Sequence, residues 1–312
     1  MVMRILIELP TWLGDCVMAT PAIENIVDVY PEAELTFAGS TVAITAVKHH
    51  PRAQATQVLN KSYLSLYKTS RSLGKFDVFI SFRSSTRSKI FGFFVSADCK
   101  YQFDKHKYNH GHQVEKYNDF VNDSLSVNTA PGQLVLHFDE QSTANPSAPT
   151  VGINPGASYG SAKRWYPEEF SKVAATLSDR YDVVIFGGPG EVDMAADIEI
   201  GLQQAGVTNY QNLAGKTSVS ELIERILRLD LFITGDSGPM HVAAALQVPT
   251  VAIFGPTKDK ETSQWMNNKS AIVKKNLDCQ PCMKRACPLE HHDCMRLIDA
   301  DEVLTAVKRL NL

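Results

Sequence analysis

The chain lacks any apolar segment long enough to cross a bilayer. Its longest apolar runs, such as Phe91 to Val95 and Val248 to Phe254, fall far short of the ~20 residues that a membrane-spanning helix needs. The N-terminus also lacks the charged, apolar and small-residue pattern of a signal peptide and opens directly on an apolar strand. These absences argue against an integral membrane protein or a secreted one, and we expect the chain to be cytoplasmic.

Cysteines are few and unevenly placed, which argues against a disulfide-stabilised extracellular fold. Of the six cysteines, Cys16 and Cys99 stand apart. The other four crowd into one segment with the spacing C-x2-C-x4-C-x6-C, namely Cys279, Cys282, Cys287 and Cys294. Four thiols so close in sequence can hold a structural zinc ion or an iron–sulfur cluster, although the spacing is not that of a standard zinc ribbon or finger. Reduced thiols without a metal are the alternative, and neither interpretation implies a catalytic role.

Charge is nearly balanced over the whole chain, with a net charge of -3, but it is not evenly distributed. Between Lys61 and Lys116 there are eleven Lys or Arg residues against four Asp or Glu residues. A basic segment in a mildly acidic protein predicts an anionic partner or a membrane surface for that segment. The alternative is a face that is simply solvated.

The 312 residues, of which 44% are hydrophobic and 21% charged, suffice for two globular domains. Short apolar runs alternate with helical patterns in both halves, the clearest runs being 3–9, 35–38, 76–82, 150–154, 182–186, 231–234 and 250–254. Such runs indicate parallel sheets that are covered on both faces. The polar segment Asp139 to Ala148 separates the halves. We therefore predict an α/β fold with two Rossmann-like domains, 1–145 and 146–312, that face each other across a cleft.

One segment, Tyr101 to Tyr117, fits neither a strand nor a helix pattern. It contains four Tyr or Phe residues, three His and three Lys without a clean period. We expect either a loop over a binding cleft or a surface helix with its aromatic residues packed beneath it.

The strongest local signal for a ligand is the strand-to-helix turn at 235–239, with the sequence GDSGP. Unpaired N–H groups and the positive end of a helix dipole meet at such a turn, which favours a bound phosphate. Asp236 and His241 flank this point. The alternative is that these small residues serve only the geometry of the turn and that His241 is a core histidine.

The glycine pattern argues against a dinucleotide-dependent oxidoreductase. The first strand is followed by PTWLGD, Pro10 to Asp15, where GxGxxG would be needed. Gly187 to Gly190 (GGPG) ends another strand but is a weak signal, because glycine runs often serve only turn geometry. Glu191 directly follows it and is placed to accept hydrogen bonds from a ribose.

Three segments in chain order resemble the ADP-heptose:lipopolysaccharide heptosyltransferases. They are PTWLGD at 10–15, PGASYGSAKRW at 155–165, and DSGPMHVAAAL at 236–246, which a strand and Gly255-Pro256-Thr257 follow. The first resembles the acceptor-side loop of the family, the second its phosphate-binding loop, and the third its nucleotide-sugar half. The wording of the motifs is closer to heptosyltransferase II than to heptosyltransferase I. The resemblance implies a GT-B fold with the donor nucleotide held mainly by the C-terminal half, whereas the cysteine segment is not part of the family pattern.

The resemblance also implies roles for single residues. Asp15 is the expected general base for the acceptor hydroxyl, with helix capping as the alternative role. Lys163 is expected to stabilise the departing ADP without a metal, and as a loop lysine its removal is expected to leave the fold intact. The expected donor-binding residues are Ser158, Tyr159, Lys163, Glu191, Thr217, Asp236, Ser237, Gly238 and His241. The expected acceptor-binding residues are Thr11, Trp12, Gly14, Arg83 and Arg87.

The implied reaction is an inverting transfer of L-glycero-D-manno-heptose from ADP-heptose to the first heptose of the lipopolysaccharide inner core. No cofactor is expected for catalysis. Expected partners are ADP-heptose, a lipid A-linked acceptor and, transiently, the cytoplasmic face of the inner membrane, without nucleic acid. Three alternatives remain: a GT-B enzyme that uses another nucleotide sugar, heptosyltransferase I acting on Kdo-lipid A, and a non-catalytic binding protein, which Asp15 and Lys163 together disfavour.

Overall fold

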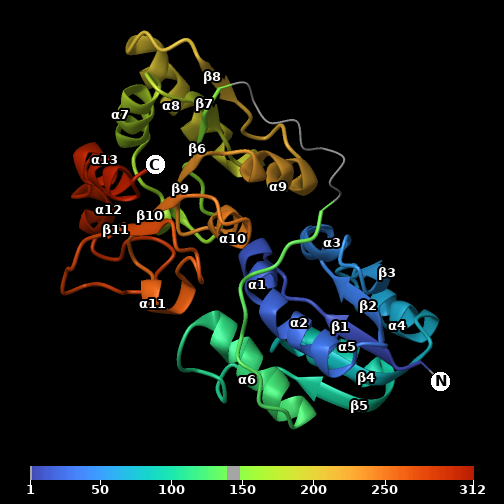
Figure 1. Cartoon of the computed structure of the whole chain (residues 1–312). Coiled ribbons are helices and arrows are strands. Elements are labelled where there is room, and N and C mark those ends of the chain that lie inside the picture. Colours follow the sequence, from blue (N-terminus) through green and yellow to red (C-terminus); the bar gives the residue numbers. More distant parts are fainter. Residues whose placement is uncertain (1, 139–147) are drawn as a thin grey trace. The chain divides into compact units, whose positions relative to one another are not determined.

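The structure, a computed structural model, describes residues 2–138 and 148–312 (Figure 1). The chain divides into two compact units, Met1–Asp139 and Glu140–Leu312. The boundary predicted from the sequence, between 145 and 146, lies outside the described residues. Each unit has its own sheet and its own core, and the two are described separately below.

Unit 1 is built on a five-stranded parallel sheet in the order β3-β2-β1-β4-β5. Its strands are β1 (Arg4–Glu8), β2 (Glu34–Gly39), β3 (Ala53–Val58), β4 (Lys75–Ser81) and β5 (Ser96–Gln102). The central strands are almost wholly apolar and buried, and Leu6, Phe79 and Phe91 belong to one core cluster. Burial on both faces explains why the central strands were recognisable as continuous apolar runs.

The helices in the described part of unit 1 are α1 (Leu13–Met18), α2 (Thr20–Val29), α3 (Thr41–Val47), α4 (Tyr63–Ser72) and α5 (Thr86–Phe94), which connect the strands, and α6 (Gln113–Leu125), which follows β5. Within the unit α4 packs against α5, and α2 packs against α6. The side chains of Ser40 and Ser85 accept hydrogen bonds from backbone N–H groups at the starts of α3 and α5.

Three differences from the sequence prediction concern unit 1. The helix expected from Cys16 begins at Leu13 and is divided at Ala19, because Pro21 begins a new helix. Tyr101 to Tyr117 is neither a long loop nor one helix, since it contains the end of β5, a turn and the start of α6. The exposed strand β3, with the sequence AQATQV, was missed because it has no apolar run.

Unit 2 is built on a six-stranded parallel sheet in the order β11-β10-β9-β6-β7-β8. Its strands are β6 (Thr150–Asn154), β7 (Asp182–Ile185), β8 (Tyr210–Asn212), β9 (Leu231–Gly235), β10 (Thr250–Phe254) and β11 (Ser270–Lys274). Read from β8, this is the strand order of a Rossmann fold. The prediction of an α/β fold with parallel sheets is therefore confirmed.

The helices of unit 2 are α7 (Pro167–Leu177), α8 (Val192–Gln204), α9 (Val219–Leu227), α10 (Gly238–Ala245), α11 (Asp259–Thr262), α12 (Asp293–Arg296) and α13 (Ala300–Arg309). Two short 3-10 turns, η2 (Ser161–Lys163) and η3 (Pro189–Glu191), precede α7 and α8. The helix α7 packs against α8 and α13 (Figure 1). In the part of the chain that the structure describes, no helix is long and apolar enough to cross a membrane.

The order of the strands in each sheet indicates where a ligand would bind. In each sheet the chain reverses its direction of strand addition once, between β1 and β4 in unit 1 and between β6 and β9 in unit 2. Ligands of open α/β sheets bind outside the carboxyl ends of the strands at this point. The residues that follow β1, β4, β6 and β9 are the motif residues that the sequence singled out.

Candidate active site

An almost buried ion pair lies at the switch point of unit 2. Lys163 Nζ is 2.5 Å from Asp236 Oδ2, and the two side chains are 12% and 4% exposed. The hydroxyl of Thr257 donates to the same carboxylate oxygen at 2.5 Å. These residues follow β6, β9 and β10 respectively, so the structure brings together three segments that the sequence motifs had marked separately.

Tyr159 forms one wall of this ion-pair site. Its ring lies under Lys163 Nζ at 4.8 Å and under the guanidinium of Arg285 at 5.5 Å. Its hydroxyl donates to the carbonyl of Met283 at 2.8 Å. Two cations lie against one aromatic ring, and such a cluster of positive charge can attract the phosphates of a nucleoside diphosphate. Ser158, the neighbouring donor candidate, is exposed.

The start of α10 adds backbone donors to the same region. Ser237 is the N-cap of this helix, but its side chain makes no capping hydrogen bond. It is instead held by Asn154, whose Nδ2 donates to the hydroxyls of Ser237 and Thr234 at 3.2 and 3.0 Å. Gly238 begins the helix, and His241 is buried within its first turn. The structure thus has a helix that starts at the turn the sequence singled out, and binding of an anion there stays a prediction.

Glu191 and Thr217 lie farther along the carboxyl edge of the sheet. Glu191 is buried, and its Oε2 accepts a hydrogen bond from the N–H of Gly188 at 2.6 Å. Its other oxygen is 3.8 Å from Arg164 Nη2. One carboxylate oxygen of Glu191 is thus used to fix η3, and its role toward a ribose stays a prediction. Thr217 is half-buried directly before the capping box that Ser218 and Glu221 form at the start of α9.

Asp15 lies in the first turn of α1 in unit 1 and is half-buried. The N-cap of that helix is Trp12, and no side chain caps it. The capping role considered for Asp15 therefore does not apply, because the helix begins at Leu13 and not at Cys16. Burial, and after it the charge of Asp15, raises the pKa of the Cys16 thiol to about 12.

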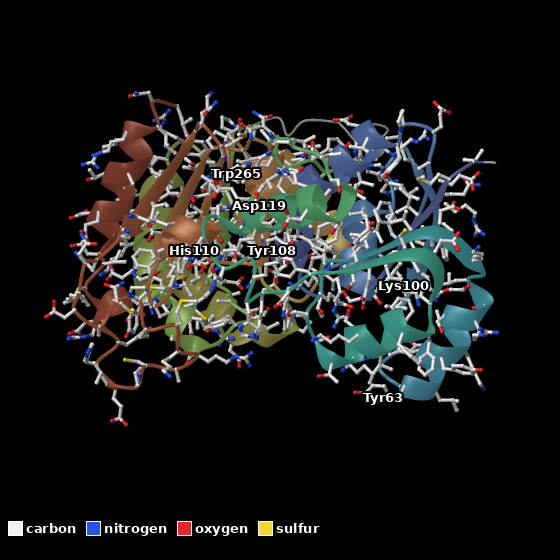
Figure 2. All side chains as sticks on the ribbon, turned by 90° about the horizontal axis from the view of Figure 1, so that it is seen from below. Tyr63, Lys100, Tyr108, His110, Asp119 and Trp265 are labelled. Carbon is white, nitrogen blue, oxygen red and sulfur yellow. The ribbon has the colours of Figure 1, made fainter. Side chains whose placement is uncertain are left out.

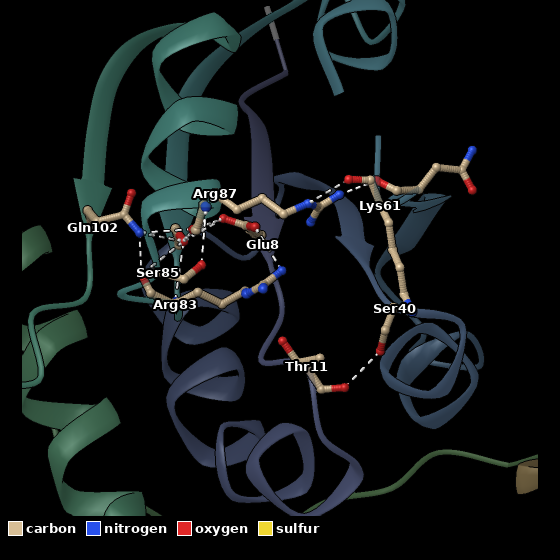
Figure 3. Close-up of polar contacts among 11 residues, drawn as sticks. Glu8, Thr11, Ser40, Lys61, Arg83, Ser85, Arg87 and Gln102 are labelled. Atoms are coloured by element: carbon tan, nitrogen blue, oxygen red, sulfur yellow. Dashed lines mark hydrogen bonds and ion pairs between the residues drawn. The ribbon is translucent and has the colours of Figure 1, made fainter. Parts of the chain in front are cut away.

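The other predicted acceptor residues of the segment 10–15 differ in their exposure. Trp12 is 61% exposed, which is unusual for a residue that offers so much apolar surface. Thr11 is exposed, and its carbonyl accepts a hydrogen bond from the hydroxyl of Ser40 at 2.8 Å (Figure 3). Gly14 is buried in the first turn of α1.

A buried polar network lies beside this loop, at the carboxyl ends of β1 and β4 (Figure 3). Glu8 is fully buried, and its Oε2 accepts hydrogen bonds from the hydroxyls of Ser81, at 2.7 Å, and Ser88. Its Oε1 is 3.4 Å from Arg83 Nη1. Burial raises the pKa of Glu8, while the two hydroxyls and the charges of Arg83 and Arg87 act in the opposite direction and offset part of this rise.

This network holds Arg83 at three points. Its backbone N–H donates to Ser81 Oγ at 3.3 Å, its carbonyl accepts from Gln102 Nε2, and its guanidinium meets Glu8. The side chain is 16% exposed. Sequence reasoning singled out Arg83 but missed Glu8 and Gln102. The one signal available was Glu8 itself, an acidic residue near the end of the run MRILIEL, whose other charged residue is Arg4 at its start.

Arg87 differs from Arg83 in its contacts. Its Nη2 donates to the carbonyl of Asn60, and its Nε donates to the carbonyl of Lys61 at 3.4 Å. Arg87 thus fixes the loop between β3 and α4, and this loop carries the exposed Lys61. Figure 3 shows Arg83, Arg87 and Lys61 around the same region of unit 1.

One group of three metal-ligating side chains occurs within residues 2–138 and 148–312, formed by Glu24, His50 and His137. The Nε2 atoms of the two histidines lie 3.3 and 3.1 Å from Glu24 Oε1. His50 Nδ1, however, accepts a hydrogen bond from the N–H of Arg52 at 3.1 Å. The hydrogen of a neutral His50 ring must then reside on Nε2, where a metal would need a lone pair. We therefore interpret the group as a hydrogen-bonded clasp.

The energetics of this clasp agree with that interpretation. Burial alone would raise the pKa of Glu24, but the hydrogen bonds from His50 and His137 outweigh it, so that the pKa of this carboxyl is lowered. The clasp joins α2 to the segment that contains His137. Thr20, also on α2, holds the same segment, since its hydroxyl oxygen accepts a hydrogen bond from the N–H of Val135 at 2.9 Å.

The four clustered cysteines line one small cavity of about 20 Å³ in unit 2. Cys294 is buried, and the pKa of its thiol is raised to about 11, first by burial and then by the other three cysteines. His292 also lines the cavity, but its nitrogens contact the carbonyl of Ala162, at 2.9 Å, and the hydroxyl of Tyr166, at 3.2 Å. His291 lines it too, and its Nδ1 accepts a hydrogen bond from the N–H of Asp293 at 3.0 Å. The four thiols share this cavity, but within the described residues only Glu24, His50 and His137 bring three ligand atoms within 4.8 Å of one another.

The cysteine segment also supports the loop that carries Lys163. The N–H of Ala162 donates to the carbonyl of Arg285 at 3.1 Å, and the N–H of Met283 donates to the carbonyl of Pro256 at 2.9 Å. A Cβ on Gly160 would lie 2.3 Å from the Arg285 carbonyl, so only glycine fits there. The segment is therefore part of the framework of the site, a contact that no pattern in the sequence indicated.

Comparison with known proteins identifies the class and the family. In fold the chain matches E. coli ADP-heptose LPS heptosyltransferase II, with a TM-score of 0.82 at 21% identity over 99% of this chain and 98% of that one. It also matches the iron-containing dodecameric glycosyltransferase TibC from enterotoxigenic E. coli, with a TM-score of 0.64 at 18% identity over 100% of this chain and 77% of that one. The fold is thus that of the GT-B glycosyltransferases.

The sequence comparisons are more specific. Residues 74–292 match glycosyltransferase family 9 (heptosyltransferase). Lipooligosaccharide heptosyltransferase 2 of Campylobacter jejuni is 41% identical over 318 residues, which cover 99% of this chain and 98% of the relative. The chain therefore belongs to glycosyltransferase family 9, and the predicted resemblance is confirmed.

Proposed function

We propose that this enzyme transfers L-glycero-D-manno-heptose from ADP-heptose to the first heptose of the lipopolysaccharide inner core, with inversion at the anomeric carbon. The observation that carries the proposal is the convergence of Lys163, Asp236 and Thr257 on one point at the switch of the unit 2 sheet. The similarity of the chain to proteins named heptosyltransferase 2 or II supports the choice of acceptor.

On the donor side, the leaving group is a nucleoside diphosphate, and negative charge grows on it as the glycosidic bond breaks. Lys163 meets that charge, and the start of α10 at Ser237 and Gly238 supplies backbone donors. Tyr159 and Ser158 flank the diphosphate. Asp236 and His241 contact the sugar or the phosphate of the donor. Glu191 and Thr217 are assigned to the ribose and the adenine.

On the acceptor side, Asp15 takes the proton from the attacking hydroxyl, since a sugar hydroxyl is a poor nucleophile at neutral pH. Thr11, Trp12 and Gly14 form the loop that receives the acceptor sugar. Arg83, fixed in place by Glu8, binds an anionic group of the acceptor. The contacts of Arg87 with backbone carbonyls make it a positioning residue for the Lys61 loop.

The expected result of a ligand screen is a melting temperature that ADP raises more than UDP, GDP or NAD⁺ does, because a ligand of the folded state stabilises it by mass action. In a transfer assay, ADP-heptose should be consumed with an acceptor that carries one heptose and not with one that ends in Kdo. Preference for UDP would assign another nucleotide sugar as donor. Transfer to the Kdo-terminated acceptor would instead assign the first heptose step.

We further propose that the four cysteines hold one structural metal ion, zinc or iron. All four cysteines line one small cavity, and the fold match to an iron-containing glycosyltransferase supports iron as one of the two candidates. Binding would have to draw the sulfur atoms together, since no cysteine group within the described residues has three ligand atoms within 4.8 Å of one another. Such an ion would fix the segment that contacts Tyr159 and Ala162 and would take no part in the chemistry.

Metal analysis of the purified chain should then find about one equivalent of zinc or iron. Cys282→Ser should remove the metal, lower the melting temperature and weaken ADP binding, because the loop under Tyr159 loses its support. Cys99→Ser, a change at an exposed cysteine outside the segment, should alter none of these. A metal-free wild-type protein with full affinity for ADP would remove the metal from the proposal.

A further inference from the structure

Arg164 directly follows Lys163 in the loop after β6 and has no part in the proposed mechanism. Its side chain is 33% exposed, but its Nε is buried and has no hydrogen-bond partner within residues 2–138 and 148–312. Buried donors in native proteins are nearly always paired, so a buried donor without an acceptor requires an explanation. At a candidate ligand site, a bound molecule can supply the missing acceptor.

The chain is fixed on both sides of Arg164, and this sets the direction of its side chain. Lys163 pairs with Asp236, while Trp165 is buried and its Nε1 donates to the carbonyl of Ile298 at 3.0 Å. The backbone of Arg164 is extended, with φ -86° and ψ 122°. Because successive side chains of an extended segment point to opposite sides, Arg164 points away from the core that receives Trp165.

The guanidinium of Arg164 faces Glu191, whose carboxylate is closely packed. Glu191 Oε1 is 3.8 Å from Arg164 Nη2, and Oε2 accepts the N–H of Gly188 at 2.6 Å. A Cβ on Gly156 would lie 2.6 Å from Glu191 Cγ, so the backbone there touches the side chain. The two residues follow the neighbouring strands β6 and β7, and their separation is therefore set by the framework of the sheet.

This separation fits a hydroxyl group between the two side chains. At 3.8 Å it is too long for a direct charge-assisted hydrogen bond, in which the two atoms lie about 2.7–2.9 Å apart. A hydroxyl oxygen can lie about 2.8 Å from both atoms, since it donates to the carboxylate and accepts from the guanidinium. A phosphate fits less well, because its charge has the same sign as that of Glu191.

We propose that Arg164 is a specificity-determining residue of the donor site and that, together with Glu191, it binds one hydroxyl of the donor's ribose. Glu191 accepts the hydrogen of this hydroxyl, and Arg164 donates to its oxygen. The inference rests on the proposed function, which assigns Glu191 to the ribose, and it adds the second half of the contact. A nucleotide without this hydroxyl leaves both side chains without a partner, and unpaired polar groups in a site reject such an analogue.

Calorimetry of the full chain with ADP, 2′-deoxy-ADP and 3′-deoxy-ADP tests the proposal. The wild type should bind ADP on the order of tenfold to a hundredfold more tightly than the analogue that lacks the contacted hydroxyl. Arg164→Met keeps an unbranched side chain but has no donor, so it should weaken the binding of ADP and should not weaken that of this analogue. A purely structural role for Arg164 would weaken the binding of all three nucleotides equally, which would overturn the proposal.

Glu191→Gln tests the other half of the contact. The amide oxygen still accepts the N–H of Gly188, but the second oxygen is replaced by an NH2 donor, so the ribose hydroxyl loses its acceptor. This variant should lose the same preference for ADP. The double variant Arg164→Met/Glu191→Gln should bind ADP about as weakly as the weaker single variant, because both changes remove one shared contact. Additive losses would show that the two residues act independently and would refute a shared hydroxyl.

Two matched variants control for general effects. Arg309→Met removes an exposed arginine from α13 of unit 2, and Lys100→Met removes an exposed cation from β5 of unit 1, where Figure 2 labels it. Both variants should keep the wild-type affinity for ADP and the preference for ADP over the deoxy analogue. Losses equal to that of Arg164→Met would show that binding reports only net charge, and Arg164 would then have no special role.

The result for the ribose contact is separable from the result for the proposed function. If the wild type prefers UDP to ADP, the proposed donor is wrong, and the same comparison with UDP and its deoxy analogues decides whether Arg164 reads the ribose. If the wild type transfers heptose from ADP-heptose but binds ADP and both deoxy analogues equally, the proposed function stands and the role of Arg164 is overturned.

Discussion

Asp15→Asn is expected to slow heptose transfer by about 10²- to 10⁴-fold, the contribution typical of a general base. Asparagine keeps the size and shape of aspartate but has no site for the proton of the attacking hydroxyl. The position of Asp15 inside the first turn of α1, with Trp12 as the N-cap, means that no capping hydrogen bond is lost in the exchange. The melting temperature should therefore change little while ADP release falls.

ADP release with a heptose-bearing acceptor, measured beside the thermal stability, tests this expectation. Affinity for ADP should survive, because the nucleotide is assigned to unit 2. Asp28→Asn is a suitable control, since Asp28 is an exposed residue of α2 in the same unit. An Asp15→Asn enzyme with near wild-type turnover would remove Asp15 from the mechanism and leave the base unidentified.

Lys163→Ala is expected to lower kcat by about 10²- to 10³-fold, the effect of removing one group that stabilises charge in a transition state. It should also weaken the binding of ADP. The structure changes one expectation drawn from the sequence, namely that this substitution leaves the fold intact. Lys163 is the partner of the almost fully buried Asp236, so its loss leaves a carboxylate without compensation. Breaking such a pair costs about 3–5 kcal/mol.

Calorimetry with ADP, carried out well below the melting transition, separates the two effects of Lys163→Ala. Lys163→Arg is the informative companion, since it retains the ion pair with Asp236, and with it the stability, but replaces a point charge by a planar group. Lys172→Ala serves as a control, because Lys172 is an exposed lysine on α7. A lower melting temperature with unchanged ADP affinity and unchanged turnover would assign Lys163 to the framework alone.

The sequence predicted the central strands and the turns that follow them. Strand 150–154 was predicted with the bounds that the structure gives, because a fully buried parallel strand is a continuous apolar run. The contact of Lys163 with Asp236 was implicit in two motifs at the ends of neighbouring strands, since parallel strands end at the same edge of a sheet. The strands β3, β5, β8 and β11 were missed because each lies at a sheet edge and is partly exposed.

Other parts of the site could not be predicted because they depend on which strands become neighbours. Glu8 and Gln102 contact the same two hydroxyls, those of Ser81 and Ser88, only because β4 lies between β1 and β5. In the sequence Arg83 and Arg87 are two equivalent cations four positions apart. Only the structure shows that one is held by a buried carboxylate and that the other binds the carbonyls of a neighbouring loop.

The way in which Arg83 is held has a consequence for the engineering of this enzyme. Its anchors, Glu8, Ser81 and Gln102, belong to β1, β4 and β5, and none belongs to the loop after Arg83. Ser85 is different from its neighbours Ser84 and Thr86, because it caps α5, the helix whose Ser88 donates to Glu8. A library that varies only positions 84 and 86 should therefore change the loop beside Arg83 while the guanidinium stays held by Glu8. If Arg83 binds the acceptor as proposed, such a library would change the shape of the site without moving its cation.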